Sequence, residues 1–341
     1  MAIKNKNKKS KVFLFLSSIP LILIMGLRDK YIGTDAIQFY SVFTEINTGN
    51  YGWLDYGDTR YEVGYFLLNK IIGLFTQDPQ VFLLIISVII VAGICIFIYQ
   101  NSRNPFMSLI LFQTLYFYCN SFNLVRQYIA IAIVVNSLTF IKERKIIKSS
   151  LIIIIASTFH TSALFLLPLV ILLCITKINK LNIYMYFVGF AIFSFLIPIM
   201  IQVSVKLFPR YDYYLTYNTG YSGGKILPYL YIIMVIIGIS LIRKLKISDL
   251  ELKNYYMFSI FVFITGLLGI IANLYFQSAS RIMAYSSIYL IVFIPEFVNF
   301  FTRKVDRLII TYGVITLTII YYNLLLHSGV AEVYPYAFFK N

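Results

Sequence analysis

The dominant feature of this sequence is a series of long apolar segments separated by short polar joints. A helix needs about 20 mainly apolar residues to cross the hydrocarbon core of a bilayer. The segments approach or exceed that length, and they lie at residues 12–27, 80–99, 105–119, 124–141, 149–175, 181–205, 226–242, 254–273, 282–301 and 308–326. The pattern predicts an all-α polytopic membrane protein with about 9–11 transmembrane helices.

Composition excludes a soluble globular protein. Hydrophobic residues make up 60% of the chain and charged residues 13%, whereas about 25% of a soluble domain is charged. The cysteines Cys95, Cys119 and Cys174 all lie inside apolar segments without CxxC spacing, so we expect neither a disulfide framework nor a structural zinc site. No internal repeat or soluble segment is visible, and residues 1–341 are expected to form a single membrane domain.

The excess of positive charge sets the predicted orientation. The chain has 29 Lys and Arg against 14 Asp and Glu, a net charge of +15. Cytoplasmic joints of membrane proteins collect positive charge, so we expect no nucleic-acid partner. The lysine-rich N-terminus and the joints at 142–148 and 243–253 are then cytoplasmic. This requires 149–175 to form a hairpin of two short helices bent near His160, since a single span would place 243–253 outside.

Two polar segments, residues 28–60 and 206–225, are expected to be external loops. The second is rich in tyrosine, whose rings could stack on sugars or belong to an interfacial aromatic belt. Between the first loop and the next span, residues 61–76 are short for a crossing, and polar residues recur there every three or four positions. This spacing predicts an amphipathic helix that lies in the outer interface or dips into the membrane and returns.

Two arginines stand at predicted helix starts on the outer side. Arg126 falls in the first turn of a helix with Ser121 or Asn123 as its cap, and Arg281 repeats the arrangement behind a serine. A cation in a first turn opposes the helix dipole unless an anion also binds there. The pair could therefore grip a pyrophosphate. Alternatively, each could extend to lipid headgroups or form a structural ion pair.

The remaining candidates are one histidine and two acids. His160 stands at the bend of the proposed hairpin, where an ionisable group could accept a proton or donate to phosphate, or could simply bond a neighbouring helix. Asp35 and Glu62 could each activate a sugar hydroxyl, or could each be the ion-pair partner of an arginine. The chain has no nucleotide-binding, zinc-protease or serine-hydrolase motif.

Several of these polar residues, together with their neighbours, form an ordered set of motifs along the chain. The set is Arg28, Gly33-Thr34-Asp35, Tyr40, Arg60-Tyr61-Glu62, Val125-Arg126-Gln127, Ala130, Ala156 and Phe159-His160-Thr161-Ser162-Ala163. It resembles the EpsG family of Wzy-like polysaccharide polymerases. The likeness runs from about residue 28 to 175, and beyond residue 180 only the region around Arg281 looks similar.

The resemblance implies a multi-pass enzyme of the bacterial plasma membrane. Such an enzyme joins lipid-linked oligosaccharide repeat units at the outer face into exopolysaccharide, capsule or O-antigen. The donor would be a glycan on undecaprenyl pyrophosphate and the acceptor the next lipid-linked unit, with no nucleotide sugar, metal or other cofactor. Membrane lipids, a flippase and a chain-length regulator of the same pathway are the further partners that the resemblance suggests.

The resemblance to the EpsG family also suggests roles for individual residues. The pyrophosphate would be bound by Arg126, Gln127 and Arg281. His160 would serve as a base or phosphate donor, and Asp35 or Glu62 would act on the acceptor. The residues expected to bind glycan are Arg28, Tyr40, Arg60, Arg210 and Tyr211.

Two other classes of membrane protein remain possible from the sequence. A membrane O-acyltransferase that modifies glycans would also carry a histidine and arginines within the membrane, but its histidine should open to the cytoplasmic acyl donor. A flippase for lipid-linked oligosaccharides, or a solute transporter, would be expected to show an inverted repeat or cavity-lining charges in both halves. No such repeat is apparent.

The predicted orientation can be tested by labelling. A cysteine introduced at Asn50 or Thr219 should react with a membrane-impermeant maleimide added to intact cells, because both positions are expected outside. A cysteine at Lys145 should react only after the cells are opened. Labelling at Lys145 from outside would contradict the hairpin.

Overall fold

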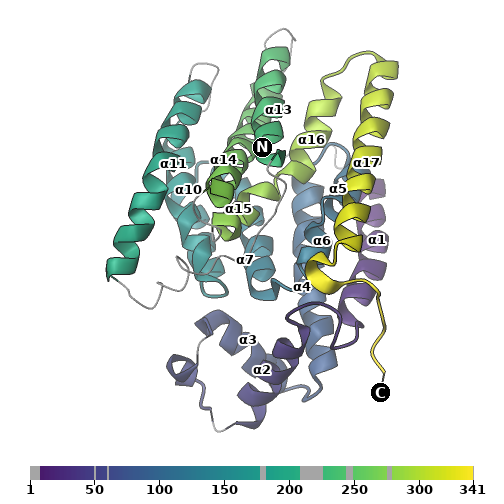
Figure 1. Ribbon diagram of the computed structural model, residues 1–341, viewed down its shortest axis with the longest axis vertical. Coiled ribbons are helices and arrows are strands. Elements are labelled where there is room, and N and C mark those ends of the chain that lie inside the picture. Colours follow the sequence, from purple (N-terminus) through teal and green to yellow (C-terminus); the bar gives the residue numbers. More distant parts are fainter. Residues whose placement is uncertain are drawn as a thin grey trace. The chain divides into compact units, whose positions relative to one another are not determined.

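The computed structural model describes residues 8–49, 51–59, 61–176, 182–207, 226–242, 249–274 and 279–340. Within these ranges the chain is helical, and the pairing of Arg28 with Phe338 is an isolated β-bridge rather than part of a strand. The predicted all-α class is confirmed. The chain divides into two compact units, residues 1–175 with 305–341 and residues 176–304 (Figure 1). We describe each unit by itself.

The first unit contains most of the elements. In chain order they are α1 (Lys8–Gly26), α2 (Ala36–Thr48), η1 (Asp55–Asp58), α3 (Val63–Gly73), α4 (Pro79–Asn101), α5 (Pro105–Thr114), α6 (Phe117–Asn120), α7 (Val125–Asn136), α8 (Leu138–Lys142), α9 (Ile146–Ser157), η2 (Thr161–Leu166), α10 (Leu167–Ile175), α17 (Lys304–His327) and η4 (Val330–Glu332). The second unit contains α11 (Asn182–Leu207), α13 (Leu227–Ile242), α14 (Asp249–Leu274), α15 (Ala279–Ser287) and α16 (Leu290–Asn299).

Five helices among the described residues are long and apolar enough to cross a membrane. They are Lys8–Gly26, Pro79–Asn101, Val125–Lys142, Glu251–Asn273 and Lys304–His327, and the bent pair Ser280–Ser287 and Leu290–Asn299, with 42° between its parts, would make a sixth. The predicted 9–11 helices also include shorter apolar helices that fall below this length, such as Pro105–Thr114, Ile146–Ser157 and Leu227–Ile242. The segment 105–119, for example, is broken at Tyr116, whose backbone is left-handed with φ 70°.

Local sequence explains where the helices of the first unit begin. Asp78 accepts a hydrogen bond from the backbone N–H of Gln80 at 2.8 Å and caps α4, whose first residue is a proline. Asn104 caps α5 in the same way by accepting from Met107 at 3.1 Å. A capping side chain followed by proline is a strong helix start.

The first unit is built around a row of packed helices in which α1 contacts α4, α4 contacts α7, and α7 contacts α9. Small residues allow the close approaches. A Cβ added to Gly93 of α4 would lie 2.7 Å from the side chain of Ala132 on α7, and one added to Gly26 would lie 2.8 Å from the Cα of Leu84. This row fixes the start of α7, which carries Arg126, relative to the end of α1.

The predicted loop at 28–60 contains α2 and η1, and the predicted amphipathic helix is α3. Its polar stripe does not face water. Tyr65 and Asn69 are buried, and the Asn69 carbonyl accepts a hydrogen bond from Asn47 of α2 at 3.3 Å. Large apolar side chains are instead exposed on α3 and just after it, at Ile71, Leu74 and Phe75.

The predicted hairpin at 149–175 is present in the structure. α9 and α10 pack against each other, and the hydroxyl of Ser149 near the start of α9 lies 3.3 Å from the sulfur of Cys174 near the end of α10. The chain therefore reverses between the two helices, in the segment that contains Thr158, Phe159 and His160.

The second unit is organised around α14, which packs against α11, α13, α15 and α16. Aromatic stacking joins these helices, with ring centroids 3.8 Å apart for Phe261 and Tyr289 and 5.2 Å apart for Tyr255 and Phe293. Apart from Lys206 and Leu207, the predicted external loop at 206–225 lies outside the described residues.

The hairpin makes a direct prediction. The variant S149C should form an intramolecular disulfide with the native Cys174 under mild oxidation, because the two side chains already touch. In a single straight helix, residues 149 and 174 would lie about 40 Å apart at about 1.5 Å per residue, and no disulfide could form. The matched control is S157C at the far end of α9, which should remain reduced.

Candidate functional site

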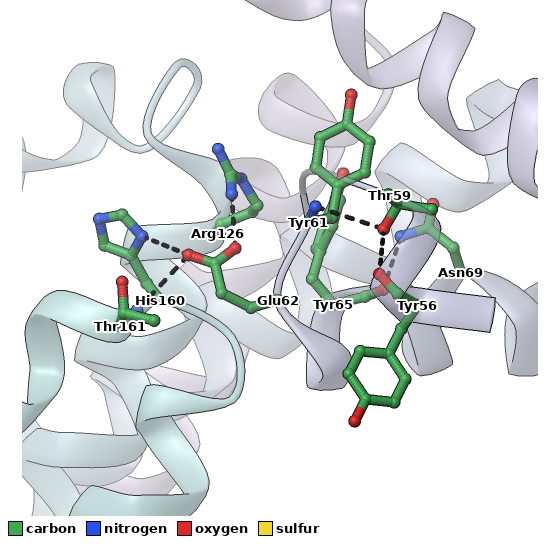
Figure 2. A network of polar contacts seen from close by, with 9 residues as sticks. All are labelled: Tyr56, Thr59, Tyr61, Glu62, Tyr65, Asn69, Arg126, His160 and Thr161. Carbon is green, nitrogen blue, oxygen red and sulfur yellow. Dashed lines mark hydrogen bonds and ion pairs between the residues drawn. The ribbon is translucent and has the colours of Figure 1, made fainter. Parts of the chain in front are cut away.

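A single carboxylate joins three segments that are distant in sequence. Oε2 of Glu62 accepts a hydrogen bond from Nη1 of Arg126 at 2.5 Å, and Oε1 lies 3.1 Å from Nδ1 of His160 (Figure 2). The backbone N–H of Thr161 makes a longer contact of 3.4 Å with Oε1. We refer to Glu62, Arg126 and His160 as the Glu62 cluster.

The backbone at the start of α3 places Glu62 against the hairpin. Glu62 is the extended residue that precedes α3, and the N–H of Gly64 donates to the carbonyl of Thr158 at 2.7 Å. A Cβ on Gly64 would lie 2.8 Å from that carbonyl oxygen, so a larger residue would push the two segments apart. This contact holds Glu62 beside the turn that carries His160.

Arg126 is the second residue of α7, as predicted, but the cap differs. The residue before the helix is Leu124, and no side chain caps it. Ser121 instead donates to the Tyr118 carbonyl, and Asn123 donates to the carbonyl of Ala331. Leu124 thus provides no side-chain cap at the positive end of the α7 dipole, where Arg126 adds a cation, and this charge arrangement favours an anion.

Two tyrosine rings flank the Arg126 guanidinium. Its central carbon lies 5.5 Å from the ring centre of Tyr61 and 5.9 Å from that of Tyr65. Such contacts contribute about 0.5–1 kcal/mol at exposed sites. The Arg126 side chain is 31% exposed, against 13% for Glu62 and 13% for His160. Arg126 is thus held by its partners and yet remains the most accessible member of the cluster.

The Glu62 carboxylate also selects the tautomer of His160. An ionised carboxylate only accepts hydrogen bonds, so the Nδ1 that faces it at 3.1 Å must carry a proton. When the imidazole is neutral, Nε2 then carries a lone pair that can accept a proton from a substrate. Figure 2 shows this second nitrogen turned away from Glu62.

The pKa of Glu62 argues against the predicted role of this residue as a base. Burial would raise the pKa, but the hydrogen bond with His160 and the charge of Arg126 outweigh burial and lower it to about 2. A carboxylate that stays ionised at neutral pH is a weak proton acceptor there. Glu62 is therefore an ion-pair partner, which was the alternative role expected for it, and His160 is the better candidate for the base.

Arg28 and Tyr40 belong to a second polar network in the first unit. Arg28 is fully buried and donates to the carbonyls of Met25 at 3.0 Å and Phe122 at 2.8 Å. The half-buried Tyr40 donates to the side chain of Gln80, whose amide nitrogen in turn donates to the carbonyl of Gly26. Full burial leaves Arg28 no surface to offer a glycan, so the predicted glycan contact does not fit this structure.

The other candidates are placed as follows. Asp35 immediately precedes α2 without capping it through its side chain. The side chain of Gln127 is 2% exposed, and this burial favours a packing role for Gln127 over the predicted contact with pyrophosphate. Arg281 lies in α15 of the second unit, and its approach to Arg126 stays a prediction. Three predicted residues lie outside the described part of the chain: Arg60, Arg210 and Tyr211.

Some contributors were not anticipated. Tyr65 of α3 and Tyr61, which precedes that helix, both contact the Arg126 guanidinium, and the recurrence of an aromatic ring four residues on was the sequence signal that could have indicated a shared partner. The role of Gly64 gave no sequence signal, because its close neighbour, Thr158, is distant in the chain and approaches only once the hairpin has formed.

Comparison with known proteins identifies one family. The model of the EpsG family matches residues 11–338, nearly the whole chain. No curated protein and no solved structure matches the chain. The match extends the resemblance inferred from residues 28–175 across both compact units.

The low pKa of Glu62 predicts how stability depends on pH. Since the pKa falls from 4.5 to about 2 on folding, the stabilisation is present above pH 4.5 and is lost as pH drops toward 2. E62Q should therefore melt at a lower temperature than the wild type in detergent at pH 7, and the difference should shrink below pH 4.5. The control is E45Q, at an exposed acid of α2. A difference between E62Q and wild type that stayed constant with pH would contradict the ion pair.

Proposed function

The chain belongs to the EpsG family, and on that premise we propose that it polymerises lipid-linked oligosaccharides at the outer face of a bacterial plasma membrane. Family membership and the membrane-spanning helices support an exopolysaccharide-polymerase-like membrane protein. The finer proposal is a glycosyltransferase that takes its donor glycan from undecaprenyl pyrophosphate, and that uses a hydroxyl of a second lipid-linked unit as acceptor.

The observation that carries this proposal is the pairing of a base and a cation on one carboxylate. His160 and Arg126 contact opposite oxygens of Glu62, so an imidazole able to accept a proton and a guanidinium able to bind phosphate lie close together. Polymerisation needs both at once, because the acceptor oxygen loses a proton while the leaving pyrophosphate gains charge.

The proposed reaction exchanges one glycosidic bond for another. The bond between the anomeric carbon and the pyrophosphate oxygen breaks, and a bond forms from that carbon to the acceptor oxygen. The acceptor proton moves to Nε2 of His160. The exposed N–H groups of Arg126, with the uncapped first turn of α7, stabilise the negative charge on the departing polyprenyl pyrophosphate. Arg281 is the proposed second cation, and Asp35 is an alternative base.

The cluster makes a quantitative prediction for activity. H160A should lower polymer output by about 10²- to 10⁴-fold, the usual contribution of a positioned base, with single-repeat lipid-linked glycans accumulating instead. R126K should also lower polymer output strongly, because lysine retains the charge but lacks the planar guanidinium that binds phosphate through two hydrogen bonds. The measurement is a lipid extract and a polymer assay from the same cells, with protein level checked by immunoblot. The control is H327A, which alters the exposed histidine at the end of α17.

The same extract, combined with a membrane-impermeant glycan label applied to intact cells to report which face carries the repeats, separates the polymerase from the alternative functions. In cells that lack a polymerase, single repeats gather on the outer face of the membrane. Loss of an O-acyltransferase would leave chain length unchanged and remove acyl groups, and loss of a flippase would trap single repeats on the inner face. Normal polymer length from both H160A and R126K would overturn the assigned site.

A further inference from the structure

The first unit contains a buried cation that the proposed reaction does not use. Arg28, just beyond α1, has an exposed fraction of 0%. Among the described residues no carboxylate lies within ion-pair distance of it. Burial lowers the pKa of Arg28 to about 10, so it remains charged at neutral pH. A buried charge is costly unless it is hydrogen-bonded. In Arg28 the two terminal nitrogens have carbonyl acceptors, whereas Nε has none among the described residues.

Arg28 has one hydrogen-bond partner in the segment that leads into α7 and one at the end of α1. Nη2 of Arg28 donates to the carbonyl of Phe122 at 2.8 Å, and the guanidinium lies 4.6 Å from the ring centre of the same residue. Nη1 donates to Met25 in the last turn of α1. Phe122 lies four residues before Arg126, in the segment that precedes α7, so Arg28 ties the end of α1 to the segment that presents Arg126.

Gly33 packs against the same segment. Its φ is +101°, and a Cβ there would lie 2.5 Å from Oδ1 of Asn123, so both backbone conformation and space require glycine. Asn123 is 8% exposed and is held on its other side by the carbonyl of Ala331, to which its Nδ2 donates at 2.9 Å.

Residues 332–339 form backbone hydrogen bonds with the segment 27–33. The N–H of Asp29 donates to the Ala337 carbonyl at 2.9 Å, and the N–H of Phe339 donates to Leu27 at 3.0 Å. Gly33 also donates to the carbonyl of Glu332 at 2.9 Å. Backbone bonds on both sides of Arg28 thus prevent the segment 27–33 from moving away.

We propose that Arg28 is a positioning residue, which fixes the segment 121–124 and thereby aims Arg126 at its substrate. The proposal rests on the proposed function for the role of Arg126, but the mechanical link between Arg28 and the start of α7 does not.

The link can be measured without any activity assay. In the purified full-length protein, R28K keeps the charge but loses the guanidinium fork that spans Met25 and Phe122. Hydrogen exchange in peptides covering 116–125, which contain the protected amides of Asn123 and Leu124, should quicken roughly tenfold. Exchange in α9 should not change. R103K, at an exposed arginine of the first unit, is the matched control.

Other exchange patterns would overturn the proposal. Unchanged exchange in 116–125 would mean that Arg28 does not hold this segment. Faster exchange throughout the unit would mean that Arg28 supports the whole fold rather than the start of α7. If R28K fails to accumulate, F122L provides the second test, because it removes the ring beneath the guanidinium but keeps the carbonyl. F122L should give the same local pattern with a smaller increase.

A double-mutant comparison then tests whether Arg28 acts through Arg126. R28K should lower polymer output about fivefold or more in the wild-type background, and should have no further effect in R126K, because residues that act as a unit are not additive. Independent, multiplying losses would overturn the positioning role. Normal output from R126K alone would instead contradict the proposed function, while the exchange result would still decide the link between Arg28 and α7.

Discussion

The contact on which the rest of the site depends is the shared carboxylate of Glu62. It balances the charge of Arg126 on one oxygen and orients the imidazole of His160 on the other. Removing one partner from a largely buried charged group leaves the other uncompensated, and such losses are strongly destabilising. The same carboxylate therefore holds the hairpin turn, the start of α3 and the start of α7 in one place, and its contact with Nδ1 of His160 selects the tautomer of that ring.

The polar residues of the first unit divide into two sets with different tasks. The Glu62 cluster offers partly exposed side chains that can meet a substrate. Arg28, Gly33 and Tyr40 lie in buried or half-buried contacts that join α1, α2 and α4 to the segment before α7. The precision of the cluster is supplied by this second set, because a phosphate-binding arginine is useful only when its backbone is fixed.

The sequence was sufficient to predict the helical membrane class, the hairpin and the first-turn position of Arg126, because each depends on local hydrophobic length or charge, although the predicted caps of α7 were wrong. It also singled out Glu62 and His160, but it could not predict that they touch, since that contact depends on the close approach of Gly64 to Thr158. Nor could composition tell a buried Arg28 from an exposed one. The break at Tyr116 reduced the number of long spans, because an apolar run looks continuous whatever its backbone conformation.

The tautomer of His160 tests this account most directly. The chain has two histidines, so nitrogen NMR of ¹⁵N-histidine-labelled protein carrying H327Q would report on His160 alone. If Glu62 orients the imidazole, the neutral ring should carry its proton on Nδ1 and leave Nε2 unprotonated, and E62Q should abolish this preference. A neutral His160 protonated on Nε2 in the otherwise wild-type protein would contradict the shared carboxylate, and with it the assignment of Nε2 as the proton acceptor.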